Sequence, residues 1–342
     1  MTATRAARHR MPGRLVAGGL SSMAVASLAL VVALYAADSE PRDQGLGIGG
    51  PGEFVHWLLP FFRLLTTLAT VGCAGGLLAA VVLLRTDGGP LGTQGRRAVR
   101  DAGNAAVIWA VAAFAGAVVT AAILLNTPVN LLRYRLDDAL GVPEVKALLI
   151  TGILVVAVAV GVRQVQTASA AGLGVLVAVT ALIPPALTAY PRNEAYVVVA
   201  GAALVLHVIA ATSWVGGLAG LVRYGRASRD GLPYVLERFS QVALISSITV
   251  LVSGLLSGAG RLAARAGGFD AVPGILTTDP YAALLLAKTV VFAVLILGGW
   301  IHRRQVVSNL IEPGPRFWQL VAAELLIMSA ALGLSVAASQ AI

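Results

Sequence analysis

The chain has 342 residues, of which 58% are hydrophobic and only 12% are charged. Soluble globular domains carry about 25% charged residues, so this composition excludes a soluble enzyme with an ordinary hydrated surface, and its abundance of aliphatic residues excludes a disordered chain. The net charge of +9 would point to nucleic acid in a soluble protein, but here it indicates basic loops that set membrane topology and no nucleic-acid partner.

Nine apolar runs are long enough to cross a lipid bilayer, for which an α-helix needs about 20 residues. They predict an all-α fold, a polytopic transmembrane bundle of about nine spans. In chain order the predicted spans are residues 15–37, 54–84, 104–125, 145–162, 168–189, 195–222, 241–262, 281–301 and 318–339. The first run is longer than the about 7–15 apolar residues of a signal peptide, so it is predicted to be a span. Pro60 is expected to kink the second span or to mark its start.

The charges of the connecting segments predict the orientation of the bundle. With the N-terminus in the cytoplasm, the cytoplasmic segments hold 16 of the 25 Lys and Arg residues and the opposite side holds six. The positive-inside rule therefore predicts a cytoplasmic N-terminus and an external C-terminus. The external side also holds ten of the 16 acidic residues, which would attract cations. A division near Pro191 is predicted to separate an N-terminal bundle of about five spans, residues 1–190, from a four-span domain, residues 191–342.

The sequence lacks the signatures of common enzyme classes. The motifs HExxH, GxSxG and GxxxxGK[ST] are all absent, and Cys73 is the single cysteine, so no intrachain disulfide or thiolate metal cluster can form. No connecting segment is long enough for a soluble catalytic domain. We therefore expect a protein that is not an enzyme and whose chemistry lies within the bundle or at its mouths.

The most informative residue is His207, because an ionisable group inside a span is costly and is a candidate for function. It lies near the middle of the sixth predicted span, and Trp214 lies two turns further along the same face. A histidine at this depth can be neutral and hydrogen-bonded, can bind a metal or haem, or can carry protons. Met328 has a matching depth in the last span, and imidazole with a thioether suits copper, especially Cu(I). The candidate metal ligands are therefore His207, Met328 and, at the outer mouth, His56.

Two further cations lie at similar depths in the outer half of the bundle, Arg63 in the second span and Lys288 in the eighth. They are expected either to bind backbone carbonyls between helices or to form a cationic cluster that orders an anion, a haem propionate or an acidic ligand. Glu324, in the inner half, is expected either to pair with Arg316 or Arg238 or to take part in an ion or proton step.

Haem b is the alternative cofactor to a copper ion. His56 and His207 differ in depth by roughly 10–15 Å at 1.5 Å per residue, which excludes a bis-histidine haem formed by this pair. A single axial ligand, or a His/Met pair, stays open.

Four sequence blocks in the second half resemble the copper resistance protein D (CopD) family. The blocks span residues 195–339 in order and are His207 to Leu218, Arg238-Phe239-Ser240 leading to Val252-Ser253-Gly254, Tyr281 with Leu284–Lys288 and His302-Arg303-Arg304, and Ala323-Glu324-Leu325-Leu326. The first five spans are similar to the family more weakly, chiefly around Arg63. Ala282 and His302 depart from the glycine and asparagine usual in the family, and the external loops lack clusters rich in Met and His.

This resemblance implies a multi-pass protein of the bacterial plasma (inner) membrane that transports or delivers copper, contributes to copper resistance and works with a periplasmic CopC-like partner. The family is also similar to membrane b-type cytochromes, so a haem redox protein is one alternative, and a non-transporting assembly factor is another. On the copper interpretation, copper is expected to enter at the acidic outer face, pass His56 and meet His207 with Met328. Arg63 and Lys288 are expected to shape the outer vestibule, and Glu324 the inner exit.

Overall fold

The computed structural model describes residues 11–37, 41, 50–84, 89–189, 197–225, 231–308 and 315–340. Over these ranges the fold is all-α and contains no β-strand, and nine of its helices are long and apolar enough to cross a membrane. The predicted fold class and the number of spans are thereby confirmed. The orientation of the termini and the division near residue 190 remain predictions.

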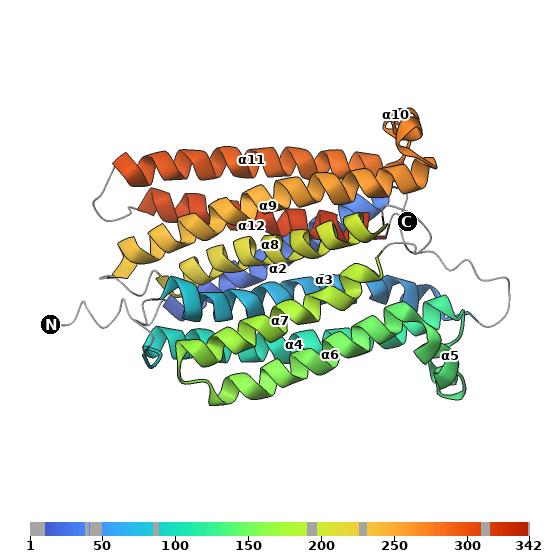
Figure 1. Cartoon of the computed structure of the whole chain (residues 1–342), viewed down its shortest axis with the longest axis horizontal. Coiled ribbons are helices and arrows are strands. Elements are labelled where there is room, and N and C mark those ends of the chain that lie inside the picture. The colour runs from blue at the N-terminus through green and yellow to red at the C-terminus, as the bar shows by residue number, and fades with distance from the viewer. Residues whose placement is uncertain are drawn as a thin grey trace.

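The long helices run roughly parallel or antiparallel to one another (Figure 1). They are α2 (Met11–Ala36), α3 (Glu53–Leu78), α4 (Thr93–Leu124), α6 (Pro143–Gly161), α7 (Ala168–Leu187), α8 (Val197–Arg223), α9 (Leu232–Ala266), α11 (Pro280–Ser308) and α12 (Pro315–Ala338). Short elements connect them: a π-helix η1 (Ala79–Leu83), the 3₁₀ turns η2 (Val129–Tyr134), η3 (Val162–Gln164) and η6 (Phe269–Ala271), and the helices α5 (Leu136–Gly141) and α10 (Val272–Ile275). Both α5 and α10 lie at the end of the bundle predicted to be external.

Two helices extend well beyond the predicted spans. Helix α4 begins at Thr93 instead of residue 104, and α9 covers Leu232–Ala266 instead of residues 241–262. The added turns contain arginines, which have good helix propensity and continue a helix into water when no Gly or Pro stops it. Pro60 lies buried inside α3, so it does not mark the start of that helix.

The helices pack as two groups joined through α3 and α8. Helices α3, α4, α6 and α7 contact one another in one group, while α8 packs along both α3 and α9. Helix α11 packs mainly against α12, and the first helix, α2, lies along α12 (Figure 1). The first and last spans of the chain are therefore neighbours.

Glycines permit a close approach between α3 and α8. A Cβ atom added to Gly216 would lie 2.8 Å from the Cα of Gly75 and 2.9 Å from the carbonyl oxygen of Val71. Side chains at this crossing would force the two backbones apart, which is why small residues support helix contacts in membranes. The glycines of the Gly216-x-x-x-Gly220 motif thus act in packing.

A threonine compensates for one of the two prolines near the end of α7. Pro185 has no N–H group, so the carbonyl of Ala181, four residues earlier, lacks its helical donor. The Thr151 hydroxyl on α6 donates to this carbonyl at 2.8 Å, and the Thr151 side chain is almost fully buried. The bond satisfies an orphan acceptor in a medium without water and ties α6 to α7.

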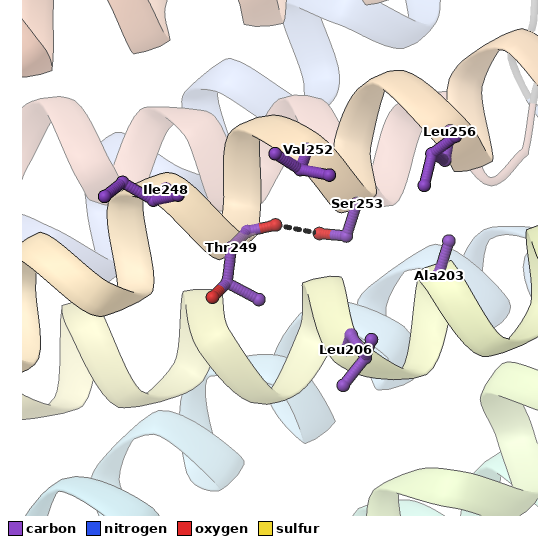
Figure 2. Close-up of a pocket in the computed structure, with 7 residues that line it drawn as sticks. All are labelled: Ala203, Leu206, Ile248, Thr249, Val252, Ser253 and Leu256. Carbon is purple, nitrogen blue, oxygen red and sulfur yellow. Dashed lines mark hydrogen bonds between the residues drawn. The ribbon is translucent and has the colours of Figure 1, made fainter.

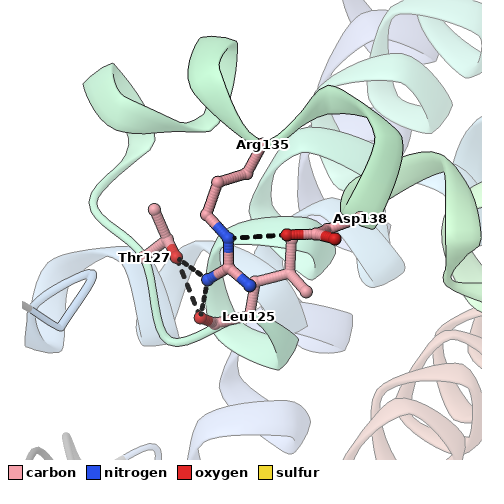
Figure 3. A network of polar contacts seen from close by, with 4 residues as sticks. All are labelled: Leu125, Thr127, Arg135 and Asp138. Carbon is pink, nitrogen blue, oxygen red and sulfur yellow. Dashed lines mark hydrogen bonds and ion pairs between the residues drawn. The ribbon is translucent and has the colours of Figure 1, made fainter.

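Charged side chains form hydrogen bonds at the ends of the helices. At the end of the bundle predicted to be external, Arg135 donates to Asp138 at 2.9 Å, to the Leu125 carbonyl at 3.1 Å and to the Thr127 hydroxyl at 2.9 Å (Figure 3). Because Leu125 ends α4, the arginine places a positive charge at a helix C-terminus, where the backbone dipole favours it.

At the inner end, Asp101 of α4 accepts hydrogen bonds from Arg223 and Tyr224, both at 2.8 Å. The contact joins α4 to the end of α8. Burial, reinforced by the bond to Asp101, raises the pKa of Tyr224 above its ordinary value.

Candidate functional site

The imidazole of His207 is held against α9. Its Nδ1 lies 3.1 Å from the carbonyl oxygen of Val250 and 3.3 Å from the Ser253 hydroxyl. A carbonyl only accepts, so Nδ1 carries the proton in this arrangement and Nε2 keeps its lone pair. The Ser253 hydroxyl itself donates to the Thr249 carbonyl (Figure 2). This is the arrangement in which a metal-binding histidine has its tautomer fixed by a second group.

Gly254 makes room for this imidazole. A Cβ atom on Gly254 would lie 3.0 Å from Cε1 and 3.2 Å from Nδ1 of His207. Any larger residue would push the ring away from α9 and stretch the bond to Val250. The Val252-Ser253-Gly254 block, noted in the sequence for its family resemblance, therefore supports His207 directly.

A shallow groove of about 240 Å³ runs beside this site between α8 and α9 (Figure 2). Seven residues line it: Ala203, Leu206, Ile248, Thr249, Val252, Ser253 and Leu256. Leu206, Val252 and Leu256 are each more than half exposed on the outside of the bundle, with exposed fractions of 54%, 52% and 51%. The groove therefore opens toward the lipid, and Ser253 joins it to His207.

The side chains of Met328 and Trp214 are part of the apolar core. Met328 is 1% exposed, and Trp214 packs edge-on against Phe292 with ring centroids 6.0 Å apart. Among the described residues no hydrogen bond links Met328 to His207. The pairing of these two residues as copper ligands stays a prediction.

His56 and Arg63 lie on α3 and bind helix ends. His56 is half-buried, with its Nδ1 3.0 Å from the Gly52 carbonyl. Arg63 is exposed and donates to the carbonyl and the hydroxyl of Ser339, at 2.9 and 3.1 Å, just past the end of α12. The guanidinium thus binds a backbone carbonyl between helices, which is one of the two roles expected for it.

Lys288 lies within electrostatic range of His207, which the sequence did not predict. The ammonium group is near enough to act electrostatically on the imidazole, and Arg261 of α9 acts in the same way on Lys288 and on Arg63. Lys288 is half-buried and has no hydrogen-bond or ion-pair partner in the described part of the chain. Arg261 was not singled out in the sequence; its position two turns after Gly254 on α9 was the available signal.

Glu324 is half-buried in α12, and its pairing with Arg316 or Arg238 stays a prediction. Across the residues that the structure describes, no group of three or more His, Cys, Asp or Glu side chains converges on a common point.

The comparison with known families matches residues 233–338 to Copper resistance protein D. No curated protein and no solved structure matches the chain. The matched segment contains almost all of α9 and the whole of α11 and α12, and so includes Val250, Ser253 and Lys288, whereas His207 lies before it. Residues 233–338 of this all-α membrane protein are therefore similar to the Copper resistance protein D family, as the sequence blocks had indicated.

Proposed function

We propose that this protein transports copper across the bacterial plasma membrane or delivers it there, with His207 as a copper ligand. The observation that carries the proposal is the hydrogen bond from Nδ1 of His207 to Val250, which leaves Nε2 as a donor atom at mid-membrane depth. The matched family is named for copper resistance, and the match includes the helix that holds this imidazole. Copper is therefore the metal that we propose.

The chemistry of the site suits Cu(I). Imidazole nitrogen and thioether sulfur are ligands that this ion accepts, and low coordination in an apolar bundle favours a monovalent cation over a divalent one. Met328 has the depth required of a second ligand. A CopC-like protein that presents copper at the acidic outer face is the partner we propose.

Cellular copper tests the proposal. Cells with an empty vector, the wild-type protein, His207→Ala or Val208→Ala are loaded with copper and the metal content is measured. Val208 is half-buried next to His207 and controls for the loss of packing. We expect copper content to differ between the vector and wild-type cells, His207→Ala to match the vector, and Val208→Ala to match the wild type. Equal copper in the vector and wild-type cells would overturn transport, and a wild-type phenotype for His207→Ala would overturn the role of this residue.

A haem b protein is the second candidate, because Nε2 of His207 is equally suited to an axial ligand. The groove beside it is about 240 Å³, below the about 300–1,000 Å³ typical of small-molecule and cofactor sites. An absorption spectrum of protein made under haem-replete conditions decides between copper and haem. A Soret band that is present in the wild type and lost in His207→Ala supports haem binding. If the wild type has no Soret band, the haem hypothesis is wrong.

A further inference from the structure

A second groove, of about 370 Å³, lies between α6 and α7, which run side by side (Figure 1). It is larger than the groove beside His207 and falls within the about 300–1,000 Å³ typical of small-molecule sites. Lys146 and Ile150 line it from one face of α6, four residues apart, and Pro184 and Thr188 line it from the end of α7 with the same spacing. The groove therefore lies at the end of the bundle predicted to be external.

The apolar part of this groove faces hydrocarbon. The hydrogen bond from Thr151 to the Ala181 carbonyl holds α6 and α7 together one residue beyond Ile150, so the groove begins outward of this bond. Ile150 and Leu187, which both line it, are 49% and 54% exposed in helices long and apolar enough to cross a membrane. This part of the groove is thus open to the acyl chains of the bilayer.

The polar part of the groove is the side chain of Lys146. This exposed lysine is the fourth residue of α6, about 5 Å along the axis from the start of the helix. Its stem can cover apolar surface while its ammonium stays at the level of the lipid headgroups. The Thr188 hydroxyl donates to the Pro185 carbonyl at 3.2 Å, so the Lys146 ammonium is the side-chain donor that the groove offers.

The acids nearest to Lys146 in the chain leave its charge available. In the part of the chain that the structure describes, Lys146 forms no ion pair with Asp137, Asp138 or Glu144. Glu144 lies two residues before it, on a different side of α6, and Asp138 is bound by Arg135 at 2.9 Å. No carboxylate is among the residues that line the groove.

We infer that this groove binds an anionic phospholipid, with an acyl chain between α6 and α7 and the phosphate on the ammonium of Lys146. A bond between ammonium and phosphate is charge-assisted and stronger than a bond between neutral groups. A zwitterionic headgroup adds a cation for which the groove has no carboxylate. Negative net charge on the headgroup therefore favours binding.

Photocrosslinking of a lipid tests the site. The full chain is purified in a neutral detergent, freed of bound lipid and mixed with phosphatidylglycerol that carries a photoreactive group in one acyl chain. We expect crosslinks within residues 141–150 and 184–188, and we expect unlabelled phosphatidylglycerol to displace the probe at lower concentration than phosphatidylcholine. Crosslinks that avoid both segments would overturn the site, as would a second copy of the chain found crosslinked there instead. Equal displacement by the two lipids would overturn the selection of an anionic headgroup.

Substitutions of Lys146 test the headgroup contact. A lysine near an anionic headgroup strengthens binding about fivefold, so Lys146→Met should need about fivefold more phosphatidylglycerol for half-maximal crosslinking, whereas Lys146→Arg keeps the wild-type value. Arg163→Met removes an exposed cation just past the opposite end of α6 and is the matched control. An unchanged value for Lys146→Met, or an equal change in Arg163→Met, would overturn the role of Lys146.

A substitution that fills the groove tests the acyl-chain contact. Gly141 also lines the groove, and a Cβ there would meet no atom within 4 Å, so Gly141→Leu adds a side chain without a backbone clash. We expect this variant to lose the crosslinks and to keep the unfolding midpoint of the wild type in detergent. Gly161→Leu, at the other end of α6 and equally free of contacts, should crosslink as the wild type does. Wild-type crosslinking by Gly141→Leu would show that the chain of the lipid lies outside the groove. No step involves copper, so a negative result leaves the proposed copper transport untouched.

Discussion

Substitution of Gly216 by alanine tests whether the contact between α3 and α8 holds the two halves of the bundle together. The added Cβ would lie 2.8 Å from the Cα and 2.9 Å from the backbone nitrogen of Gly75. Carbon atoms in contact prefer about 3.5–4.0 Å, so the helices must separate by about 0.7 Å or more. The atoms in the way belong to the backbone and cannot rotate aside.

The size of the effect follows from two opposing contributions. Overpacking costs about 1–3 kcal/mol, and a rigid backbone neighbour places this site in the upper part of that range. Replacement of a helical glycine by alanine recovers about 0.5–1 kcal/mol of backbone entropy. We expect a net loss of about 2 kcal/mol in the free energy of unfolding for Gly216→Ala.

A matched control separates the two contributions. Gly172 lies in α7 and a Cβ there would meet no atom within 4 Å, so Gly172→Ala is expected to be stabilising by about 0.5–1 kcal/mol. Thermal unfolding in detergent should therefore move the two midpoints in opposite directions, with a drop of several degrees for Gly216→Ala. If Gly216→Ala is as stable as Gly172→Ala, the close contact between α3 and α8 does not hold the bundle together.

Three other changes test separate features. Thr151→Val removes the donor to the Ala181 carbonyl and should cost about 1–3 kcal/mol in unfolding free energy, measured by thermal denaturation; an unchanged midpoint would contradict the compensation of the proline. Gly254→Ala should abolish copper accumulation in cells because the new Cβ displaces the His207 ring, while the thermal unfolding midpoint stays at the wild-type value. Normal copper accumulation in this variant would argue against the His207 ring as the ligand. Asp101→Asn weakens two hydrogen bonds at the partly exposed inner end and should cost about 1 kcal/mol, so a midpoint equal to that of the wild type would show that this contact is dispensable.

The number and approximate position of the spans could be predicted from the sequence because hydropathy dominates in a bilayer. Apolar length identifies the part of a helix within the lipid, whereas α4 and α9 continue into water through charged turns that hydropathy does not register. Their ends depend on helix propensity and on contacts with other segments.

The candidate site was only partly predictable for a related reason. Counting residues along a span gives the depth of a side chain and not the direction in which it points. Arg63 and Lys288 have similar depths, yet Arg63 binds the carbonyl that follows the end of α12 while Lys288 lies within electrostatic range of His207. The hydrogen bond from His207 to Val250 joins residues 43 positions apart, and no local pattern indicates it.

The packing of α2 along α12 has a consequence for biosynthesis. Gly333 of α12 lies against the Ala26 backbone, and Ala26 and Leu30 of α2 share a buried cluster with Val336. A ribosome releases the more N-terminal segment first, so α2 enters the membrane before its main partner α12. The contact between α2 and α12 can therefore form only after the helices between them have been made. A chain truncated before α12 would lack the partner along which α2 packs.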